Sequence, residues 1–235
     1  IGLYAYRTEV LKDISFSLEK GQALSIIGSS GSGKTTLIKL MLGYYPVSEG
    51  AIMVSGKNIN EYNLKWWRRC CGVVMQDGVI FSESIARNIA VGDSEVDIAR
   101  LEQAARIACI HDYILSLPLK YNTKIGRDGV GLSQGQKQRI LIARAVYKNP
   151  VFIFLDEATN SLDAKNEREI VENLDDFYKG RTVVVVAHRL STVKNADQIV
   201  VIDSGKVVEK GTHTELIEKQ GGYFNLVKNQ LELGN

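Results

Sequence analysis

The chain has 235 residues, of which 45% are hydrophobic and 24% are charged, and its formal net charge is +2. This length and hydrophobic content exclude a disordered chain and predict one large domain, or one domain with a subdomain. The near balance of acidic and basic residues excludes a broad basic surface for nucleic acid, and the small cluster of Lys65, Arg68 and Arg69 is interpreted as a solvated face.

The cysteines and the apolar runs indicate the cellular setting. Cys70, Cys71 and Cys109 are odd in number and lack C-x-x-C spacing, so they predict neither a disulfide framework nor a zinc site, and a reducing cytosolic setting fits them best. No apolar run approaches the roughly 20 residues that span a bilayer. Because the chain begins at Ile1 without an initiator Met, we expect it to be a piece of a longer protein.

Short apolar runs bounded by Gly, Asp or His are predicted to be buried strands. In chain order they cover residues 24–28, 72–75, 151–156, 182–187 and 198–202. Several lead into helical patterns, and this alternation is typical of an α/β fold with a largely parallel sheet, whose functional loops gather along one edge. Turn-rich sequence in the first fifty residues and around 50–56 and 205–211 predicts an antiparallel sheet beside this core, and the apolar spacing of 95–109 predicts a helical subdomain.

Residues 28–35, G-S-S-G-S-G-K-T, match the phosphate-binding pattern G-x-x-x-x-G-K-[ST] and lie between a predicted strand and the helical run 36–42. Glycines let the backbone curl so that N–H groups converge on phosphate oxygens, and the start of the following helix attracts the same anion. Lys34 is predicted to reach the β- and γ-phosphates, Thr35 to hold Mg²⁺, and Thr36 to cap or contact the α-phosphate side. The predicted ATP-binding loop comprises Gly28, Ser29, Ser30, Gly31, Ser32, Gly33, Lys34, Thr35 and Thr36. The alternative is an ordinary Gly-Ser loop.

The apolar run 151–155 ends in Asp156 and Glu157, two adjacent carboxylates at the point where a buried strand leaves the sheet. Asp156 is suited to hold Mg²⁺, directly or through water, and Glu157, which points the other way, to act as general base toward the attacking water. Taken alone, Asp-Glu at a strand end is more often a helix cap. Its pairing with a phosphate loop favours the catalytic interpretation.

Residues 132–136 read L-S-Q-G-Q and open the predicted helix 134–147; alone, they fit a capping turn. Together with the phosphate loop, Asp156-Glu157 and His188, in this order, they resemble the nucleotide-binding domain of an ABC transporter. The resemblance covers nearly the whole chain and implies the ABC ATPase fold in a single domain, 1–235. A P-loop NTPase core with its antiparallel β part would occupy roughly 1–76 and 150–235, and an α-helical signature subdomain roughly 77–149.

The segment 132–136 resembles the family signature L-S-G-G-Q and departs from it at Gln134, which leaves the affinity of the signature side open. The resemblance implies that Ser133 and Gly135 contact the γ-phosphate of ATP held by the phosphate loop of a second copy, so that one site needs an ATP-dependent homodimer. The start of a helix at this point suits that role. The predicted cross-dimer residues are Leu132, Ser133, Gln134, Gly135 and Gln136.

Two side chains that follow predicted strands take catalytic roles only through the resemblance. Gln76, after strand 72–75, would bind Mg²⁺, sense the attacking water and link to the helical subdomain. His188, after strand 182–187, would hydrogen-bond the γ-phosphate and steady Glu157. Without the resemblance, His188 is interpreted as a capped strand end, and Gln76 has no assigned role.

Two further segments are assigned in the same way. Ser161, Leu162 and Asp163 resemble the loop that communicates across the dimer, and otherwise fit a helix N-cap. Tyr4 resembles the aromatic residue that stacks on adenine, with Tyr6 as the alternative, and either fits a strand position equally well.

The sequence R-L-S-T after His188 and the sequence T-K-I-G-R-D-G at 123–129 resemble the exporter branch of the family. The resemblance implies a transmembrane domain, fused on the N-terminal side, that contacts residues 76–88 and 123–129, and a place on the cytoplasmic face of a bacterial inner membrane. The opening Tyr4-Ala5-Tyr6 and the run L-S-Q-G-Q-K-Q-R-I are most similar to bacterial exporters that carry a peptidase segment and secrete peptides.

The predicted function is that of an ATPase motor, in which two copies clamp ATP and Mg²⁺ head to tail and drive export of a substrate by differential binding of ATP to the closed dimer. One alternative is a soluble cassette ATPase that acts on nucleic acid or the ribosome, although no sustained heptad run lies between Lys34 and Ser133. A phosphate-loop kinase is a third possibility, and it leaves the L-S-Q-G-Q helix without a role.

Overall fold

The computed structural model describes residues 9–160, 162, 164–187 and 193–233. The chain divides into two compact units. The first comprises Ile1–Glu19, Leu24–Leu64 and Val186–Asn235, and the second comprises Lys20–Ala23 and Lys65–Val185. The division predicted from the resemblance, with a helical subdomain at 77–149, stays a prediction.

The first unit is built on strands β1, β7 and β8. Strand β1 (Ala23–Gly28) pairs in parallel with β7 (Gln198–Asp203), with Leu24 opposite Gln198 and Gly28 opposite Ile202. Strand β7 then pairs antiparallel with β8 (Lys206–Gly211). The four central residues of both β1 and β7 are buried, which is typical of strands covered on two faces.

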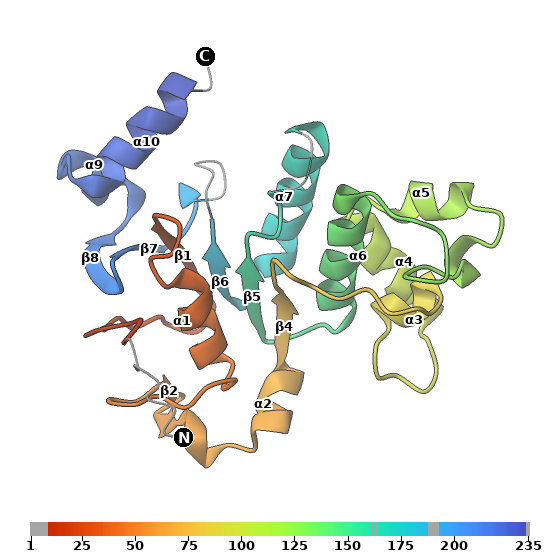
Figure 1. Ribbon diagram of the computed structural model, residues 1–235, viewed down its shortest axis with the longest axis horizontal. Helices are drawn as coiled ribbons and strands as arrows, with labels where there is room; N and C mark the ends of the chain where they lie inside the picture. Colours follow the sequence, from red (N-terminus) through yellow and green to blue (C-terminus); the bar gives the residue numbers. More distant parts are fainter. Residues whose placement is uncertain (1–8, 161, 163, 188–192, 234–235) are drawn as a thin grey trace, which may run out of the picture. The chain divides into compact units, whose positions relative to one another are not determined.

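Helices and a hairpin complete the first unit (Figure 1). Helix α1 (Lys34–Met41) follows β1 after a short loop. The hairpin of β2 (Met53–Val54) and β3 (Lys57–Asn58) leads into the 3₁₀-helix η1 (Ile59–Glu61). Helices α9 (His213–Glu218) and α10 (Gly222–Leu233) follow β8.

The second unit contains the strands β4, β5 and β6, in that order in the sheet. They span Cys71–Val74, Phe152–Asp156 and Thr182–Val186. Strands β4 and β5 are parallel, with Val74 opposite Leu155. Helix α2 (Leu64–Cys70) precedes β4, and α7 (Ala164–Tyr178) lies between β5 and β6. Between β4 and β5 lie α3 (Ile85–Ile89), α4 (Ile98–Ile107), α5 (His111–Ser116), η2 (Lys120–Asn122) and α6 (Gln134–Tyr147).

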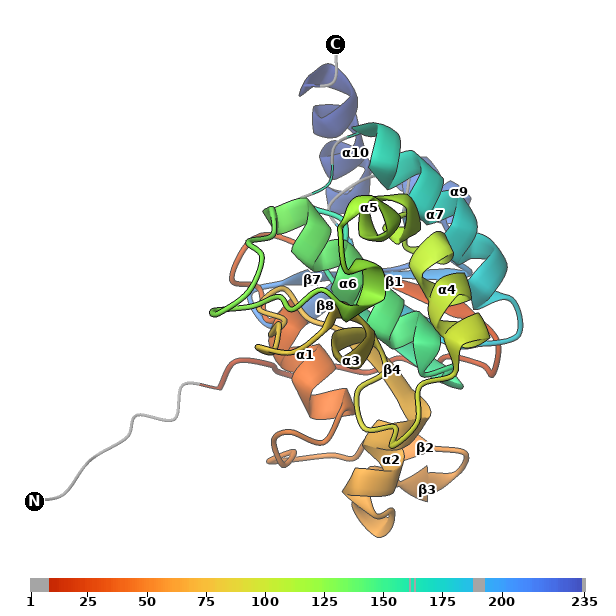
Figure 2. The same cartoon turned by 90° about the vertical axis from the view of Figure 1, so that its right-hand side faces the viewer.

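Helix α6 is the central helix of the second unit and packs against α3, α4 and β4 (Figure 2). Ser133 caps its start: the Ser133 hydroxyl accepts a hydrogen bond from the Gln136 amide at 3.2 Å, and the Gln136 side chain accepts one from the Ser133 amide at 2.8 Å. This reciprocal capping box satisfies two backbone donors at the start of the helix. The apolar run Ile140–Ala143 is buried at every position, so the middle of the helix is packed on more than one side.

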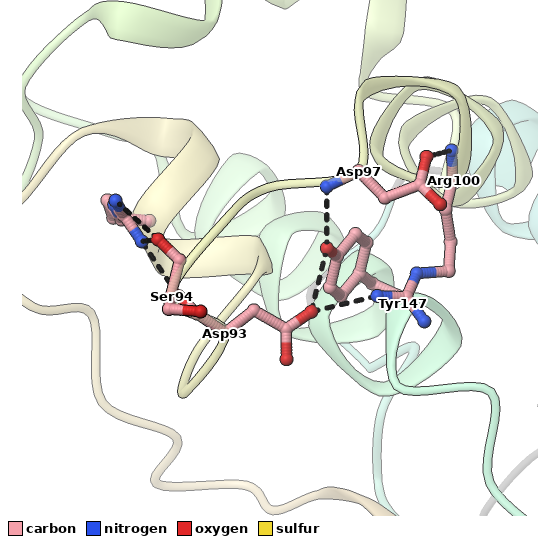
Figure 3. Close-up of polar contacts among 6 residues, drawn as sticks. Asp93, Ser94, Asp97, Arg100 and Tyr147 are labelled. Atoms are coloured by element: carbon pink, nitrogen blue, oxygen red, sulfur yellow. Dashed lines mark hydrogen bonds and ion pairs between the residues drawn. The ribbon is translucent and has the colours of Figure 1, made fainter.

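A polar cluster fixes the loop between α3 and α4 to the last residue of α6 (Figure 3). The Tyr147 hydroxyl donates to the Asp93 carboxylate at 2.9 Å and accepts from the Asp97 amide at 3.1 Å. Arg100 forms an ion pair with the same Asp93 oxygen at 2.8 Å, and its guanidinium lies 4.2 Å from the centre of the Tyr147 ring. Two helices and the loop are thereby joined through one tyrosine.

The predicted elements agree closely with the structure. Each of the five predicted strands is present with its ends within one residue of the expected positions, and α6 covers the predicted residues 134–147. Helix α4 starts later than expected because the Asp97 side chain caps it, accepting from the Arg100 amide. Antiparallel pairing occurs in β2–β3 and β7–β8, whereas residues 9–22 contain no strand. Lys12 and Gln22 form isolated backbone hydrogen bonds to Gly205 and Val183, and residues 9–22 form no ladder.

Candidate functional site

The predicted phosphate loop lies between β1 and α1 in the first unit. Gly28 is at the end of β1, where an added Cβ would lie 2.0 Å from the Ile202 carbonyl oxygen of β7, so no other residue fits. Gly31 and Gly33 have φ values of +77° and +104°, a conformation that glycine adopts readily. The loop therefore has the tightly curled backbone that the motif predicts.

Lys34 is the first residue of α1, and its side chain folds back over the loop. Its ammonium donates to the carbonyl oxygens of Gly28 at 2.9 Å and Ser29 at 2.7 Å, and the residue is 6% exposed. An ammonium held at this position places a positive charge at the loop, and that charge attracts an anion. Lys34 thus carries the main positive charge of the loop.

Two further features of the loop suit an anionic ligand. The Ser32 side chain is 3% exposed, and within the described part of the chain its hydroxyl has no hydrogen-bond partner. Gly33 is the N-cap of α1 and supplies no side-chain cap, so the amides of the first helical turn are left for a ligand. A phosphate group would satisfy these donors.

The predicted carboxylates lie at the end of β5 in the second unit. Asp156 is the last residue of the strand and is 0% exposed. Glu157 follows with φ +53°, a left-handed conformation that is uncommon for residues other than glycine. The Asn160 side-chain amide donates to the Glu157 carboxylate at 2.6 Å, and the Gln138 side chain of α6 donates to the Glu157 carbonyl at 3.0 Å. The Glu157 carboxylate is therefore held in one orientation by its own turn.

Gln76 lies in a turn just beyond β4, where the Gly78 amide donates to the Met75 carbonyl at 3.1 Å. Because β4 and β5 are parallel and in register, Gln76 and Asp156 emerge at the same edge of the second unit's sheet. The structure thus brings these two predicted residues to one edge.

The signature residues occupy the loop before α6 and its first turn, as their motif predicts. Ser133 and Gln134 are exposed, and Leu132, Gly135 and Gln136 are half-buried. The capping turn expected from the motif alone is present, and the 14-residue helix behind it presents its N-terminal end beside Ser133. This end carries a partial positive charge that favours an anion.

The loop from Val79 to Ser84 exposes apolar side chains while its backbone is held from within. Val79 is 60% exposed and Phe81 is 46% exposed. Asn88, which is 0% exposed, accepts from the Phe81 amide at 2.8 Å and donates to the carbonyls of Phe81 and Ser84 at 3.0 and 3.1 Å. These bonds fix the backbone of a loop whose side chains face solvent.

Arg144 of α6 holds the same loop from the other side. Its guanidinium donates to the Asn88 carbonyl at 2.7 Å and to the Val79 carbonyl at 2.9 Å, and it lies 5.2 Å from the centre of the Phe81 ring. Burial lowers the pKa of the Arg144 guanidinium from its ordinary value. Gln138, Asn88 and Arg144 are not among the residues predicted from the sequence, although a polar side chain among the apolar positions of a helix is a signal that could have identified them.

The two segments predicted to contact a membrane domain lie side by side. The Ile125 amide donates to the Glu83 carbonyl at 2.9 Å, and Ser84 and Lys124 form an antiparallel bridge. Gly126 has φ +93°, and an added Cβ would lie 2.9 Å from the Phe81 carbonyl oxygen. With Val130 also exposed, residues 79–84 and 123–130 form one partly apolar surface, called the apolar loop surface below.

Several predicted site residues lie outside the described part of the chain, namely Tyr4, Tyr6, Ser161, Asp163 and His188. Leu162 is described and is 6% exposed. The phosphate loop belongs to the first unit, and Gln76, Asp156, Glu157 and the signature belong to the second. The roles assigned to all of these residues stay predictions.

Comparison with known proteins identifies relatives over most of the chain. A family profile described as ABC transporter matches residues 11–160. An ATP-dependent lipid A-core flippase of Saccharophagus degradans is 45% identical over 227 residues, which cover 97% of this chain and 39% of the flippase. A putative multidrug export ATP-binding/permease protein of Staphylococcus aureus is 46% identical over 217 residues, which cover 92% of this chain and 38% of that protein.

A solved structure, that of a bacterial Atm1-family ABC exporter with ATP bound, matches with a TM-score of 0.92 and 37% identity, covering 97% of this chain and 40% of that one. These relatives are exporters, in agreement with the predicted branch, and they do not support the soluble alternative. The chain spans about 40% of their length. Since the family profile and the relatives together cover nearly all of it, the chain belongs to the ABC transporter family and is the ATPase domain of that family.

Proposed function

We propose that the chain binds ATP with Mg²⁺ and hydrolyses it to power export across a membrane. The observation that carries the proposal is the phosphate loop. There the Lys34 ammonium begins α1 beside the buried Ser32 hydroxyl, which has no hydrogen-bond partner among the described residues, and no side chain caps the start of the helix. A triphosphate brings negative charge to the ammonium and acceptor oxygens to the Ser32 hydroxyl and the amides of the first helical turn. The related exporter structure with ATP bound supports the choice of nucleotide.

Thr35, Asp156 and Gln76 are the proposed ligands of Mg²⁺. Their hydroxyl, carboxylate and amide oxygens are hard donors of the kind that Mg²⁺ prefers. Bound there, the ion would neutralise charge on the β- and γ-phosphates. Asp156 is fully buried at the end of β5, so its carboxylate is held in place for this role by the strand itself.

Glu157 is the proposed general base. It would take a proton from the water that attacks the γ-phosphorus, while the bond from that phosphorus to the ADP oxygen breaks. The Asn160 amide orients the Glu157 carboxylate, and Gln138 holds the backbone of the same residue from α6. His188 is proposed to steady Glu157 and to bond the γ-phosphate.

The proposed partner at the nucleotide is a second copy of this chain. Ser133 and Gly135 would meet the γ-phosphate bound to the other copy's loop, with the signature set 132–136 opposite that phosphate. The exposure of Ser133 beside the positive end of α6 supports this role. Leu162 and its neighbours Ser161 and Asp163 are proposed to communicate across the dimer, and Tyr4, or Tyr6, to stack on adenine.

The proposed second partner is a transmembrane domain, fused on the N-terminal side. Within the described residues, no helix is both long and apolar enough to cross a bilayer. The chain spans about 40% of its exporter relatives, and the apolar loop surface offers Val79 and Phe81 as contacts for a further domain. The proposed location is the cytoplasmic face of a bacterial inner membrane. Export of a peptide stays a prediction, since the related proteins are described as a lipid A-core flippase and a multidrug exporter.

The proposal is tested by the solution mass of Glu157→Gln with and without ATP. This variant should bind ATP, hydrolyse it about 10²- to 10⁴-fold more slowly than the unaltered chain, and shift from monomer to dimer when ATP is added. Lys34→Ala is the control, and it should remain a monomer because the loop has lost its ammonium. Near-normal hydrolysis by Glu157→Gln would refute the base assignment, and failure of the unaltered chain to bind ATP would refute the proposed function.

A further inference from the structure

Two hairpin turns of the first unit have the same sequence and the same backbone. Ser55-Gly56 joins β2 to β3, and Ser204-Gly205 joins β7 to β8. The φ values are +49° and +79° in the first turn and +49° and +78° in the second. Positive φ at both central residues is the pattern of a type I′ turn, in which glycine is favoured at the second position. As turns, the two are equivalent.

Their surroundings differ. An added Cβ at Gly56 would meet no described atom within 4 Å, whereas one at Gly205 would lie 2.1 Å from the Val10 carbonyl oxygen. The turn at Gly205 is therefore packed against residues near the start of the described chain, and the turn at Gly56 is open.

The turn at Gly205 contacts the phosphate loop. The Gly205 amide donates to the Ser32 carbonyl at 3.2 Å. The Ser29 hydroxyl donates to the carboxylate of Asp203, the last residue of β7, at 3.3 Å. Two residues of the loop are thus held by the turn.

The same turn also holds the segment from Val10 to Lys12. The Lys12 amide donates to the Gly205 carbonyl at 2.7 Å. This segment reaches the phosphate loop as well, because an added Cβ at Gly33 would lie 2.6 Å from the Leu11 side chain. One residue, Gly205, therefore bonds the phosphate loop through its amide and the segment 10–12 through its carbonyl.

We propose that Gly205 is a positioning residue that sets the placement of segment 10–12 against the phosphate loop, and so fixes the base end of a nucleotide relative to its phosphates. The inference rests on the proposed ATP binding and on the proposed role of Tyr4 or Tyr6, which precede this segment. Gly205 acts through the segment and does not contact the nucleotide itself. Gly205 should therefore affect the affinity for a nucleoside triphosphate much more than the affinity for a polyphosphate that has no base.

The chain supplies its own matched control. Gly205→Ala and Gly56→Ala impose the same strain on the same turn type, but only Gly205→Ala forces the Val10 carbonyl to move. Gly205→Asn is a second variant, in which the side chain tolerates positive φ while its Cβ still meets Val10. If Gly205→Ala fails to fold, Gly205→Asn can be measured in its place. Asp203→Ala removes the carboxylate that accepts from the Ser29 and Ser204 hydroxyls but leaves both backbone hydrogen bonds of Gly205 in place. It should weaken the binding of ATP and of tripolyphosphate equally.

The experiment is titration calorimetry of the 235-residue chain with Mg²⁺-ATP and with Mg²⁺ and inorganic tripolyphosphate. We expect Gly205→Ala and Gly205→Asn to raise the Kd for ATP about tenfold and the Kd for tripolyphosphate less than about twofold. Gly56→Ala should leave both values within about twofold of the unaltered chain. A mutant cycle that combines Gly205→Ala with Tyr4→Ala or Tyr6→Ala gives a second readout. Once the tyrosine contact to the base is removed, Gly205→Ala should raise the Kd for ATP only slightly further.

The outcomes separate the inference from the proposed function. Three results would each overturn the role of Gly205. The first is an equal effect of Gly205→Ala and Gly56→Ala on the Kd for ATP. The second is an equal loss of affinity for ATP and tripolyphosphate, and the third is full additivity in the mutant cycle. In all three cases the unaltered chain still binds ATP, and the proposed function stands. If the unaltered chain binds neither ligand, the proposed function fails.

Discussion

Cys71 shows how strongly burial controls a single residue in this fold. It begins β4 and is 0% exposed, and its thiol contacts the Trp67 carbonyl at 3.3 Å. Burial raises the pKa of the Cys71 thiol to about 12, and the nearby positive charge of Lys148 offsets only part of this effect. Since the thiolate is the reactive form, Cys71 is a structural residue at neutral pH.

This pKa predicts the pH dependence of stability. The unfolded thiol titrates near 9.0 and the folded one near 12, so between these values the unfolded chain has released a proton that the folded chain keeps. The stabilisation by Cys71 is complete below pH 9 and is lost as the pH rises toward 12. Urea unfolding at about pH 8 and pH 10 should show a smaller loss of stability for Cys71→Ala than for the unaltered chain.

Cys70→Ala is the matched control for this measurement. Burial is the largest cause of the raised Cys71 pKa and the charge of Cys70 is a smaller one, so Cys70→Ala should preserve most of the loss of stability that the unaltered chain shows between the two pH values. The same loss in Cys71→Ala as in the unaltered chain would contradict the prediction.

Single residues differ in how far the sequence could predict them. Lys34 and Asp156 were found because each belongs to a short pattern beside a buried strand. Gln138 and Arg144 were missed because their partners are backbone carbonyls that lie 19 and 56 residues away, and pairs so far apart leave no local pattern. The positive φ of Glu157 was equally unpredictable, since it depends on the turn that Asn160 closes.

At the scale of elements, α6 connects two functional ends. Its first turn carries the signature, and its Arg144 holds the Val79 carbonyl of the apolar loop surface. Asn88 of α3 accepts hydrogen bonds from both Arg144 and the Phe81 amide, and so links α6 to the same loop. A rigid helix that is fixed at both ends places the signature and the loop in a constant relation within the second unit.

We expect Asn88→Ala to release this loop. The change removes an acceptor for the Phe81 amide and leaves carbonyl groups without a donor, so the free energy of unfolding should fall by about 2 to 4 kcal/mol. Hydrogen exchange should show the Phe81 amide exchanging more than about tenfold faster. Asn60→Ala, at an exposed position, should leave both measurements unchanged, and unaltered exchange at Phe81 in Asn88→Ala would disprove the role of Asn88.

The elements were largely predictable because their signals are local. Buried strands such as β5 and β6 are unbroken apolar runs, and α6 begins at a Ser-x-x-Gln pattern that forms a capping box. The bounds of α4 were less accurate, since the decisive cap by Asp97 competes with other acidic residues nearby. Residues 9–22 were expected to join a sheet, and strand-like composition alone does not provide a pairing partner.

At the scale of the whole molecule, the proposed site needs two copies of the chain, because the phosphate loop of one copy meets the signature of the other. A site shared by two copies predicts that two inactive variants can complement each other, which a site within one copy does not. Lys34→Ala removes the ammonium of the phosphate loop, and Gly135→Asp adds a negative charge to the signature. Each variant alone should be inactive as an ATPase.

Mixing the two variants should restore hydrolysis. Because Lys34→Ala does not dimerise with itself, the active species is the mixed dimer, in which the unaltered phosphate loop of the Gly135→Asp copy meets the unaltered signature of the Lys34→Ala copy. This single intact site should give the mixture clear ATPase activity, at a level below that of the unaltered chain. Phosphate release from the mixture, and from each variant at the same total concentration, measures this. A mixture with no more activity than its components would rule out a site shared between copies.

The division of the chain into two units was the least predictable feature. A unit boundary depends on contacts between segments far apart in sequence, and the first unit joins residues before Leu64 to residues after Val186. The family was recognisable because its motifs are short, ordered and chemically specific. The arrangement of the segments between them follows from packing that no single motif records.

The capping box at Ser133 has one more consequence. A hydroxyl can accept and donate at the same time, so Ser133 can keep its bond from the Gln136 amide and still offer its proton to a phosphate. Asp would cap the helix equally well, but it would repel the anion and has no proton to give at neutral pH. The proposed contact between the signature and ATP can therefore form and break over many cycles without the first turn of α6 unwinding and reforming each time.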